Sequence, residues 1–248
     1  MSSRSPETAS GSRSRWLWPV GGAVLVILAL GLVLGGNGLL GENGGVATIT
    51  DTADERAEAD TDPPLDLARR QANDPAALGA VDAPLAIVEY SDYRCPFCGV
   101  FAREVMPGVI QEYIDRGDVR FEWRDLPVFG EASVLAATAG RAAGAQDRFW
   151  EFNEAVYAGA PQTGHPDLDE EALVAFAQEA GVPDLDRFRT DLTNPELIAL
   201  VERDAAEARA IGIGGTPFFL IGDEPISGAQ PGQVFRAEID RQLERVGK

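Results

Sequence analysis

The sequence contains few of the residues from which metal sites and many catalytic centres are built. It has two cysteines and a single histidine, His165. Two cysteines exclude a scaffold held by several disulfides and a four-cysteine zinc site within one chain, and one histidine excludes two-histidine metal motifs. The only lysine is Lys248, which leaves no internal lysine for Schiff-base or phosphate-loop chemistry. We therefore expect no metal site in this chain.

Positive charge is scarce as well. Lysine and arginine together number 21 against 40 acidic residues, which gives a formal net charge of −19 at pH 7. Proteins that bind nucleic acid in general carry a basic surface. The composition therefore argues against a nucleic-acid partner, and it leaves enzyme activity open.

A long uncharged run lies near the start of the chain, from Trp16 to Gly41. A helix needs about 20 apolar residues to cross a bilayer, and the arginines that precede this run favour a cytoplasmic N-terminus. We predict a cytoplasmic tail over residues 1–15 and a transmembrane signal anchor over 16–40, which places the rest of the chain outside the cytoplasm at the cell membrane. A cleaved secretory signal is the alternative, and it also exports the rest of the chain.

The next segment, residues 41–80, is rich in Asp, Glu, Gly, Ala, Thr and Pro, and its acidic residues far outnumber its arginines. Such a composition buries little apolar surface, so we predict an acidic flexible linker. The remaining residues, 81–248, are enough for one well-buried domain.

Hydrophobic patterning in this domain predicts strand, helix, strand, several helices, strand and helix. Pro96 suits the first turn of a helix, and Pro107 should kink that helix or end its first half. A glycine-rich stretch at 212–215 breaks the last of the central helices. The predicted strands are Leu85–Tyr90, Val119–Arg124 and Pro217–Ile221, the helical region runs from Gly130 to about Ile211, and a final helix covers Phe235–Val246.

The chemistry of the domain is concentrated in Cys95-Pro96-Phe97-Cys98. A cysteine at a helix N-terminus lies at the positive end of the helix, which stabilises its thiolate. A thiolate attacks disulfides and leaves readily from mixed disulfides. The second cysteine lies about one turn deeper, where it can resolve a mixed disulfide. This spacing predicts a redox-active Cys95–Cys98 disulfide.

Two other interpretations of the cysteine pair remain. It is half of a zinc site that another chain completes, or it is an inert structural disulfide. A disulfide across so short a loop stabilises little through loop entropy, which disfavours the structural interpretation.

Two further features have a functional and a plain interpretation. Glu89 lies within an apolar strand; it is either a solvent-facing carboxylate or a buried one with a raised pKa that relays protons to Cys98. Thr216-Pro217 precedes a strand and is either an ordinary turn or a cis peptide, which would expose neighbouring main chain to an extended substrate. We expect His165 to lie in a surface loop without a catalytic role.

Residues 89–98 (EYSDYRCPFC) and the distant 214–219 (GGTPFF) resemble the DsbA-like thiol-disulfide oxidoreductases of the thioredoxin superfamily. The preceding segment, 74–84, resembles the lead-in of membrane-anchored bacterial members. The resemblance covers about residues 72–246. It implies an α/β thioredoxin-like fold with an inserted helical subdomain at roughly 131–208.

The resemblance also implies roles for individual residues. Cys95 would be the exposed nucleophile and Cys98 the buried resolving cysteine. The supporting residues around the substrate groove and the sulfurs would be Pro96, Phe97, Thr216, a cis Pro217 and the buried acid Glu89. Many strongly oxidising members have a histidine between the cysteines, and Phe97 cannot hydrogen-bond a thiolate, which leaves the oxidising power open.

The expected function is thiol-disulfide exchange with cysteines of exported proteins outside the cytoplasm, in the direction of oxidation. The resemblance implies a membrane-embedded, quinone-linked partner that reoxidises the dithiol, and no bound cofactor is needed because the cysteine pair is the reactive group. The alternatives are a reductase or isomerase that uses the same cysteines, and a tethered peptide-binding module without redox turnover.

Overall fold

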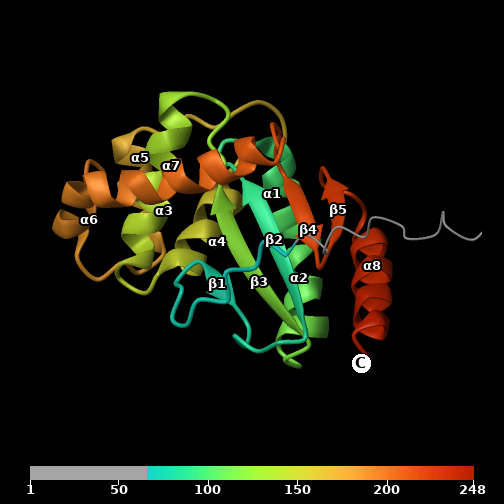
Figure 1. Cartoon of the computed structure of the whole chain (residues 1–248). Coiled ribbons are helices and arrows are strands. Elements are labelled where there is room, and N and C mark those ends of the chain that lie inside the picture. Colours follow the sequence, from blue (N-terminus) through green and yellow to red (C-terminus); the bar gives the residue numbers. More distant parts are fainter. Residues whose placement is uncertain (1–65) are drawn as a thin grey trace, which may run out of the picture. The chain divides into compact units, whose positions relative to one another are not determined.

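The computed structural model describes residues 66–248, and the domain is built on a five-stranded sheet (Figure 1). The strand order is β1-β3-β2-β4-β5; β2 and β3 run parallel, and the other pairs are antiparallel. The strands are β1 (Ala77–Leu78), β2 (Leu85–Ser91), β3 (Val119–Asp125), β4 (Phe218–Ile221) and β5 (Glu224–Ser227). Patterning predicted β2, β3 and β4, and it missed the short edge strands β1 and β5.

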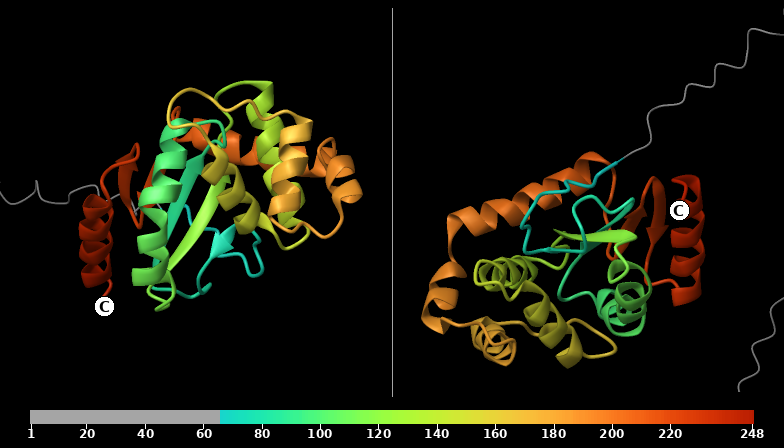
Figure 2. Two further views of the ribbon diagram at one scale, coloured as in Figure 1. Left: turned by 180° about the vertical axis from the view of Figure 1, so that it is seen from behind. Right: turned by 90° about the horizontal axis from the view of Figure 1, so that it is seen from below.

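The central strand β2 is buried along its whole length because both faces of the sheet are covered. Its side chains alternate between two hydrophobic clusters. Ile87 packs with residues of α1 (Pro96–Glu104) and α8 (Gly232–Arg245) on one face, and Val88 packs with residues of α7 (Pro195–Ala210) on the other. The position of these helices relative to the sheet can be followed from behind and from below in Figure 2.

The helix after β2 starts at the cysteine pair and is interrupted as predicted. Cys95 is the N-cap of α1, and Pro96 occupies the first turn, where a missing N–H costs no hydrogen bond. The helix ends before Pro107, which lies in the short α2 (Met106–Val109), and a π-helical turn (Ile110–Ile114) follows.

Five helices are inserted between β3 and β4, which agrees with the predicted helical insertion. The seven-residue α6 was not predicted, although Asp184 caps its first turn by accepting from the amides of Asp186 and Arg187. The inserted helices are α3 (Glu131–Gly144), α4 (Phe149–Gly159), α5 (Glu170–Glu179), α6 (Leu185–Asp191) and α7.

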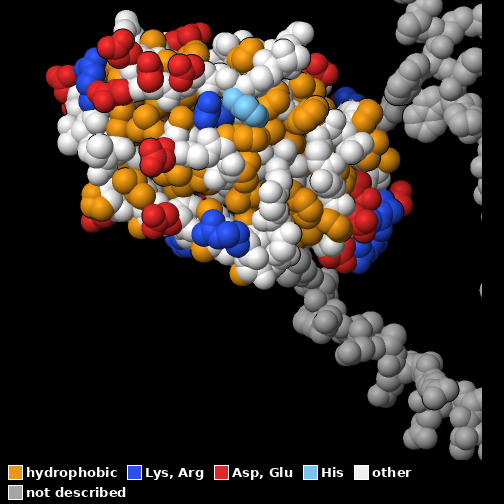
Figure 3. Space-filling view, turned by 90° about the horizontal axis from the view of Figure 1, so that it is seen from above, with side chains coloured by type: hydrophobic (Ala, Val, Ile, Leu, Met, Phe, Trp, Pro, Cys, Tyr) orange, Lys and Arg blue, Asp and Glu red, His pale blue; other side chains and the backbone are white. Residues whose placement is uncertain are grey.

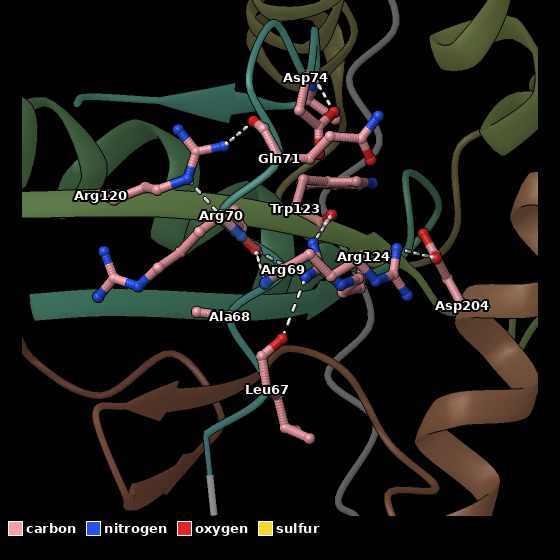
Figure 4. A network of polar contacts seen from close by, with 12 residues as sticks. Leu67, Ala68, Arg69, Arg70, Gln71, Asp74, Arg120, Trp123, Arg124 and Asp204 are labelled. Carbon is pink, nitrogen blue, oxygen red and sulfur yellow. Dashed lines mark hydrogen bonds and ion pairs between the residues drawn. The ribbon is translucent and has the colours of Figure 1, made fainter. Parts of the chain in front are cut away.

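The predicted linker extends too far into the chain, because residues 66–80 are part of the folded domain. The Glu122 carboxylate of β3 accepts hydrogen bonds from the backbone amides of Arg69 and Arg70 at 2.9 and 2.8 Å. The Arg69 guanidinium pairs with Asp204 of α7 at 2.7 Å. Figure 4 shows this segment lying across the sheet. Their composition predicted a solvated segment, whereas Glu122 and Asp204, which are distant in sequence, bind it to the folded domain.

None of the helices in the described part of the chain is long and apolar enough to cross a membrane. The predicted tail (1–15), signal anchor (16–40) and first part of the linker lie outside the described residues.

Candidate active site

The cysteine pair lies where β2 passes into α1, at the carboxyl end of the central strand. A turn after the strand, closed by a hydrogen bond of 2.9 Å from the Cys95 amide to the Asp92 carbonyl, brings Cys95 to the helix N-terminus. Both cysteines are free thiols in the structure. The site is therefore seen in its dithiol form.

Cys95 is less exposed than the resemblance implied, with 3% of its surface accessible. It lines a surface cavity of about 640 Å³ whose walls come from the start of α1 and from three separate loops. Figure 3 views the molecule from above, and hydrophobic side chains gather around the histidine there. The other lining residues are Pro96, Phe97, Val128, Phe129, Gly164, His165, Gly214, Gly215 and Thr216. The nucleophile is thus reached through an apolar cavity and does not project from the surface.

The environment of Cys95 favours its thiolate. A hydrogen bond from the Cys98 thiol is the largest influence, and together with the Thr216 side chain and the amides at the helix start it outweighs burial and lowers the pKa of Cys95 to about 6. In the thiol form, Cys95 Sγ donates to the Thr216 carbonyl at 3.3 Å. At neutral pH the Cys95 sulfur is therefore largely a nucleophilic anion.

Cys98 has the opposite character. It is completely buried, and burial raises the pKa of its thiol well above the ordinary value. The negative charges of Cys95 and Glu89 raise the pKa further. The two sulfurs therefore differ strongly, one being a stabilised thiolate and the other a protonated thiol held beside it.

Glu89 is buried in β2, so the solvent-facing interpretation of this carboxylate is wrong. Burial raises its pKa to about 8, with a smaller opposing effect from the Ser91 hydroxyl. Glu89 influences the charge of both Cys98 and Tyr157, which places it within electrostatic reach of the buried sulfur. A carboxyl group that carries a proton near neutral pH in this position is suited to exchange that proton with Cys98.

The loop before β4 contributes the remaining predicted residues. The Thr216–Pro217 peptide bond is cis, and Thr216 lies against Cys95 although 121 residues separate them. The structure thus brings Cys95, Pro96, Phe97 and Thr216 to one cavity. Phe97 is 62% exposed at its rim, where it adds apolar surface and no hydrogen-bond donor.

Sequence reasoning missed two polar contributions to the site. The Tyr157 hydroxyl from α4 lies 3.3 Å from the Ser91 hydroxyl and donates to the Asp92 carbonyl at 3.1 Å. His165 lies in an exposed loop, as expected, and it also lines the cavity that contains Cys95, which the sequence did not indicate. Neither residue lies near the cysteines in sequence, so no local pattern connected them to the site.

Arg94 connects two of the loops that line the cavity around Cys95. Its guanidinium donates to the carbonyls of Phe129 and Pro166, both at 2.9 Å, and thereby joins the loop after β3 to the loop before α5. Its own carbonyl oxygen lies 2.9 Å from His165 Nδ1. These contacts connect two of the loops that line the cavity containing Cys95.

Two adjacent sulfurs in such unlike environments define a dithiol oxidoreductase, in which one sulfur bonds the substrate and the other displaces it. The family model described as thioredoxin matches residues 71–241. The chain belongs to the thioredoxin family and is a DsbA-like thiol-disulfide oxidoreductase, with the predicted α/β fold and helical insertion.

Individual relatives agree with this assignment. Disulfide bond formation protein D of Bacillus subtilis is 28% identical over 168 residues, which cover 67% of this chain and 76% of that protein. The probable disulfide bond formation protein D of Bacillus anthracis is 33% identical over 57% of this chain and 66% of its own length. The crystal structure of oxidised BdbD from Bacillus subtilis superposes with a TM-score of 0.64 and 27% identity, covering 68% of this chain and 92% of that one.

Proposed function

We propose that the protein acts as an oxidase, donating the Cys95–Cys98 disulfide to cysteines of exported proteins outside the cytoplasm. The observation that carries this direction is the stabilised thiolate of Cys95. Whatever stabilises the dithiol form relative to the disulfide makes the disulfide a stronger oxidant. A thiolate with a low pKa is also a good leaving group from a mixed disulfide.

The proposed reaction has two exchanges. A client thiolate attacks Cys95 Sγ, the Cys95–Cys98 bond breaks, and Cys98 leaves with the electron pair and takes a proton from Glu89. A second client thiolate then attacks the client sulfur of the mixed disulfide, and Cys95 leaves as a thiolate. The client is oxidised by two electrons and the cysteine pair is reduced by two.

Turnover in this direction requires reoxidation of the dithiol. We infer a membrane-embedded, quinone-linked protein as the oxidant, and an N-terminal anchor over residues 16–40 that keeps the domain beside the membrane. The support is the uncharged run at Trp16–Gly41 and the preceding arginines.

A reductase or isomerase with the same residues is the second candidate, favoured by one observation. The Phe97 side chain offers no hydrogen bond to the Cys95 thiolate beyond the one from its backbone amide, which leaves fewer interactions to stabilise the reduced form. A peptide-binding module without turnover would keep its affinity for clients when both cysteines are replaced by serine.

The deciding experiment is equilibration of the purified protein with glutathione redox buffers. We expect a potential closer to about −120 mV than to the about −270 mV of thioredoxin. A value near that of thioredoxin would assign the reductase direction. The Cys95→Ser variant should lose all thiol oxidation, and full activity in that variant would refute the exchange mechanism itself.

A further inference from the structure

The chain's only histidine lies in the cavity through which a client cysteine must approach Cys95. His165 and Cys95 line the same cavity, and they are its only ionisable lining residues. The His165 ring contacts Phe129, with 4.0 Å between the ring centroids, so the imidazole is held against the opposite loop. A histidine placed in this way has access to the reacting sulfur of a client.

Its hydrogen bond to the main chain determines which ring nitrogen is free. Nδ1 lies 2.9 Å from the Arg94 carbonyl oxygen. Because a carbonyl oxygen only accepts, Nδ1 carries the proton and the neutral ring keeps its lone pair on Nε2. Within the described residues, Nε2 has no hydrogen-bond partner. The ring is thus hydrogen-bonded to Arg94, the residue before Cys95, and Nε2 is left as a free proton acceptor.

The reaction needs such an acceptor because the thiolate is the attacking species. An ordinary cysteine thiol has a pKa of about 8.5, so only a few per cent of a client's thiols are ionised near neutral pH. Histidine is the side chain best suited to accept a proton in this range. The site's other proton carrier, Glu89, lies buried at Cys98 and is separated from the cavity.

We propose that His165 is a catalytic residue: Nε2 takes the proton from the client thiol as that sulfur attacks Cys95. The client S–H bond breaks, the new bond joins the client sulfur to Cys95 Sγ, and the electron pair of the Cys95–Cys98 bond goes to Cys98. The imidazolium then releases its proton to water. In the reverse direction the imidazolium returns a proton to the departing client sulfur, so the role rests on thiol-disulfide exchange and does not depend on its direction.

Other charged groups surround this ring and belong in the interpretation of any pH profile. Besides Cys95 within the cavity, they are the Arg94 guanidinium, which bonds Pro166 and Phe129, and the buried Asp92 carboxylate, which accepts from the Arg94 and Val128 amides. The test must therefore separate proton transfer from a general change in the loops.

The test compares two thiols that react at the same sulfur. Full-length oxidised protein is mixed with an excess of a peptide containing one cysteine, or of 4-mercaptobenzoate, an aromatic thiol that is already largely ionised at neutral pH. His165→Asn keeps an N–H at the position of Nδ1 for the Arg94 carbonyl and removes the base, while Gln162→Ala on the same loop is the matched control. Reduction of the cysteine pair is followed in a single turnover by acid quench and alkylation.

For the peptide we expect His165→Asn to slow reduction by about tenfold or more at about pH 7, where an ordinary imidazole is mostly neutral and a client thiol is mostly protonated. The difference should disappear at high pH, where the thiol ionises unaided. With 4-mercaptobenzoate at the same pH, the variant should match the wild-type protein within about twofold. Equal slowing with both thiols would show a structural role, and no slowing with the peptide would show no role; either result overturns the proposal. If wild-type protein reacted with neither thiol, the exchange activity itself would fail, and Cys95→Ser identifies that background.

Discussion

The Sγ atom of Cys95 donates a hydrogen bond of 3.3 Å to the carbonyl oxygen of Thr216. The Thr216 hydroxyl, on the same residue, is buried without a partner among the described residues. A buried hydroxyl without a partner is costly, and this one gains an acceptor when Cys95 loses its proton. Thr216 therefore accepts from the thiol through its main chain and is placed to donate to the thiolate through its side chain.

This arrangement predicts the effect of Thr216→Val, which keeps the shape of the side chain and removes the donor. We expect the pKa of Cys95 to rise by about one unit, since a hydrogen bond to a charged group is worth about 1.5–3 kcal/mol. The ultraviolet absorbance of the thiolate, titrated against pH, measures the change. Thr216→Ser retains the hydroxyl and should stay near wild type; an identical shift in both variants would count against the hydroxyl.

Glu89 should make stability depend on pH. In the unfolded chain its carboxyl ionises near its ordinary pKa of 4.5, and in the folded protein burial raises the pKa to about 8. Between these values the folded state holds the additional proton, so the free energy of unfolding decreases as the pH rises towards about 8. Below pH 4.5 this contribution is fully present.

Glu89→Gln removes this ionisation while preserving the shape of the side chain. We expect the variant to be more stable than wild type by about 2–4 kcal/mol at a pH of about 7.5, and nearly equal to it at acidic pH. Urea unfolding at several pH values provides the comparison. Exposed Glu104→Gln is the control and should leave the pH dependence unchanged; a Glu89→Gln difference that is the same at all pH values would contradict the raised pKa.

Arg94→Ala should make Cys95 more accessible, because it frees two of the loops that line its cavity. The variant loses both hydrogen bonds from the guanidinium, to the Phe129 and Pro166 carbonyls, so the two loops open more often. Alkylation of Cys95 by iodoacetamide, measured where the thiolate is fully formed, should accelerate by about threefold or more. Arg116→Ala, which removes an exposed arginine paired with Asp118, is the control. An unchanged rate would mean that Arg94 does not limit access.

Glu122 should hold the first described segment on the sheet. Burial opposes its charge, but the Arg120 and Arg124 side chains and the Arg69 amide outweigh burial and lower the pKa of Glu122 to about 2. Stability from this carboxylate is present above its ordinary pKa of 4.5 and is lost as the pH falls through about 2.

We expect Glu122→Gln to reduce the free energy of unfolding at neutral pH by about 2–4 kcal/mol, because it leaves buried arginines without their counter-charge. Proteolysis around residues 66–71 should also become faster. Chemical unfolding and mass spectrometry of limited digests test both effects. Glu112→Gln breaks an exposed pair with Arg236 and should change little; equal effects in the two variants would exclude a special role for Glu122.

Local patterns predicted the parts of the fold that are determined locally. Alternating or continuous apolar runs predicted β2, β3 and β4, and Pro96 and Pro107 predicted where the first helix begins and is interrupted. The strand β1 has two residues and is defined by its pairing with β3, so no window of sequence contains its signal. Asp184, a good N-cap residue, was a usable local signal for the start of α6.

The same distinction applies to the site. The cysteine pair is recognisable from its own spacing. Glu89 and Thr216-Pro217 are recognisable from local features, a charge inside an apolar strand and a proline before a strand, together with the family resemblance. His165 and Arg94 reach Cys95 only through loops that fold together in three dimensions. Arg69 belonged to an apparently solvated segment because composition counts charges without showing their partners.

The inserted helices contribute to the burial that separates the two sulfurs of the pair. Cys95 and Cys98 belong to the hydrophobic cluster formed mainly by α3, α4, α5 and α6. If these helices were absent, water would reach the Cys98 sulfur, and the pKa of Cys98 would fall towards that of Cys95. The two thiols would then compete for the same client. The insertion therefore adds, by excluding water, to the difference between the two sulfurs that the helix N-terminus and Thr216 already create.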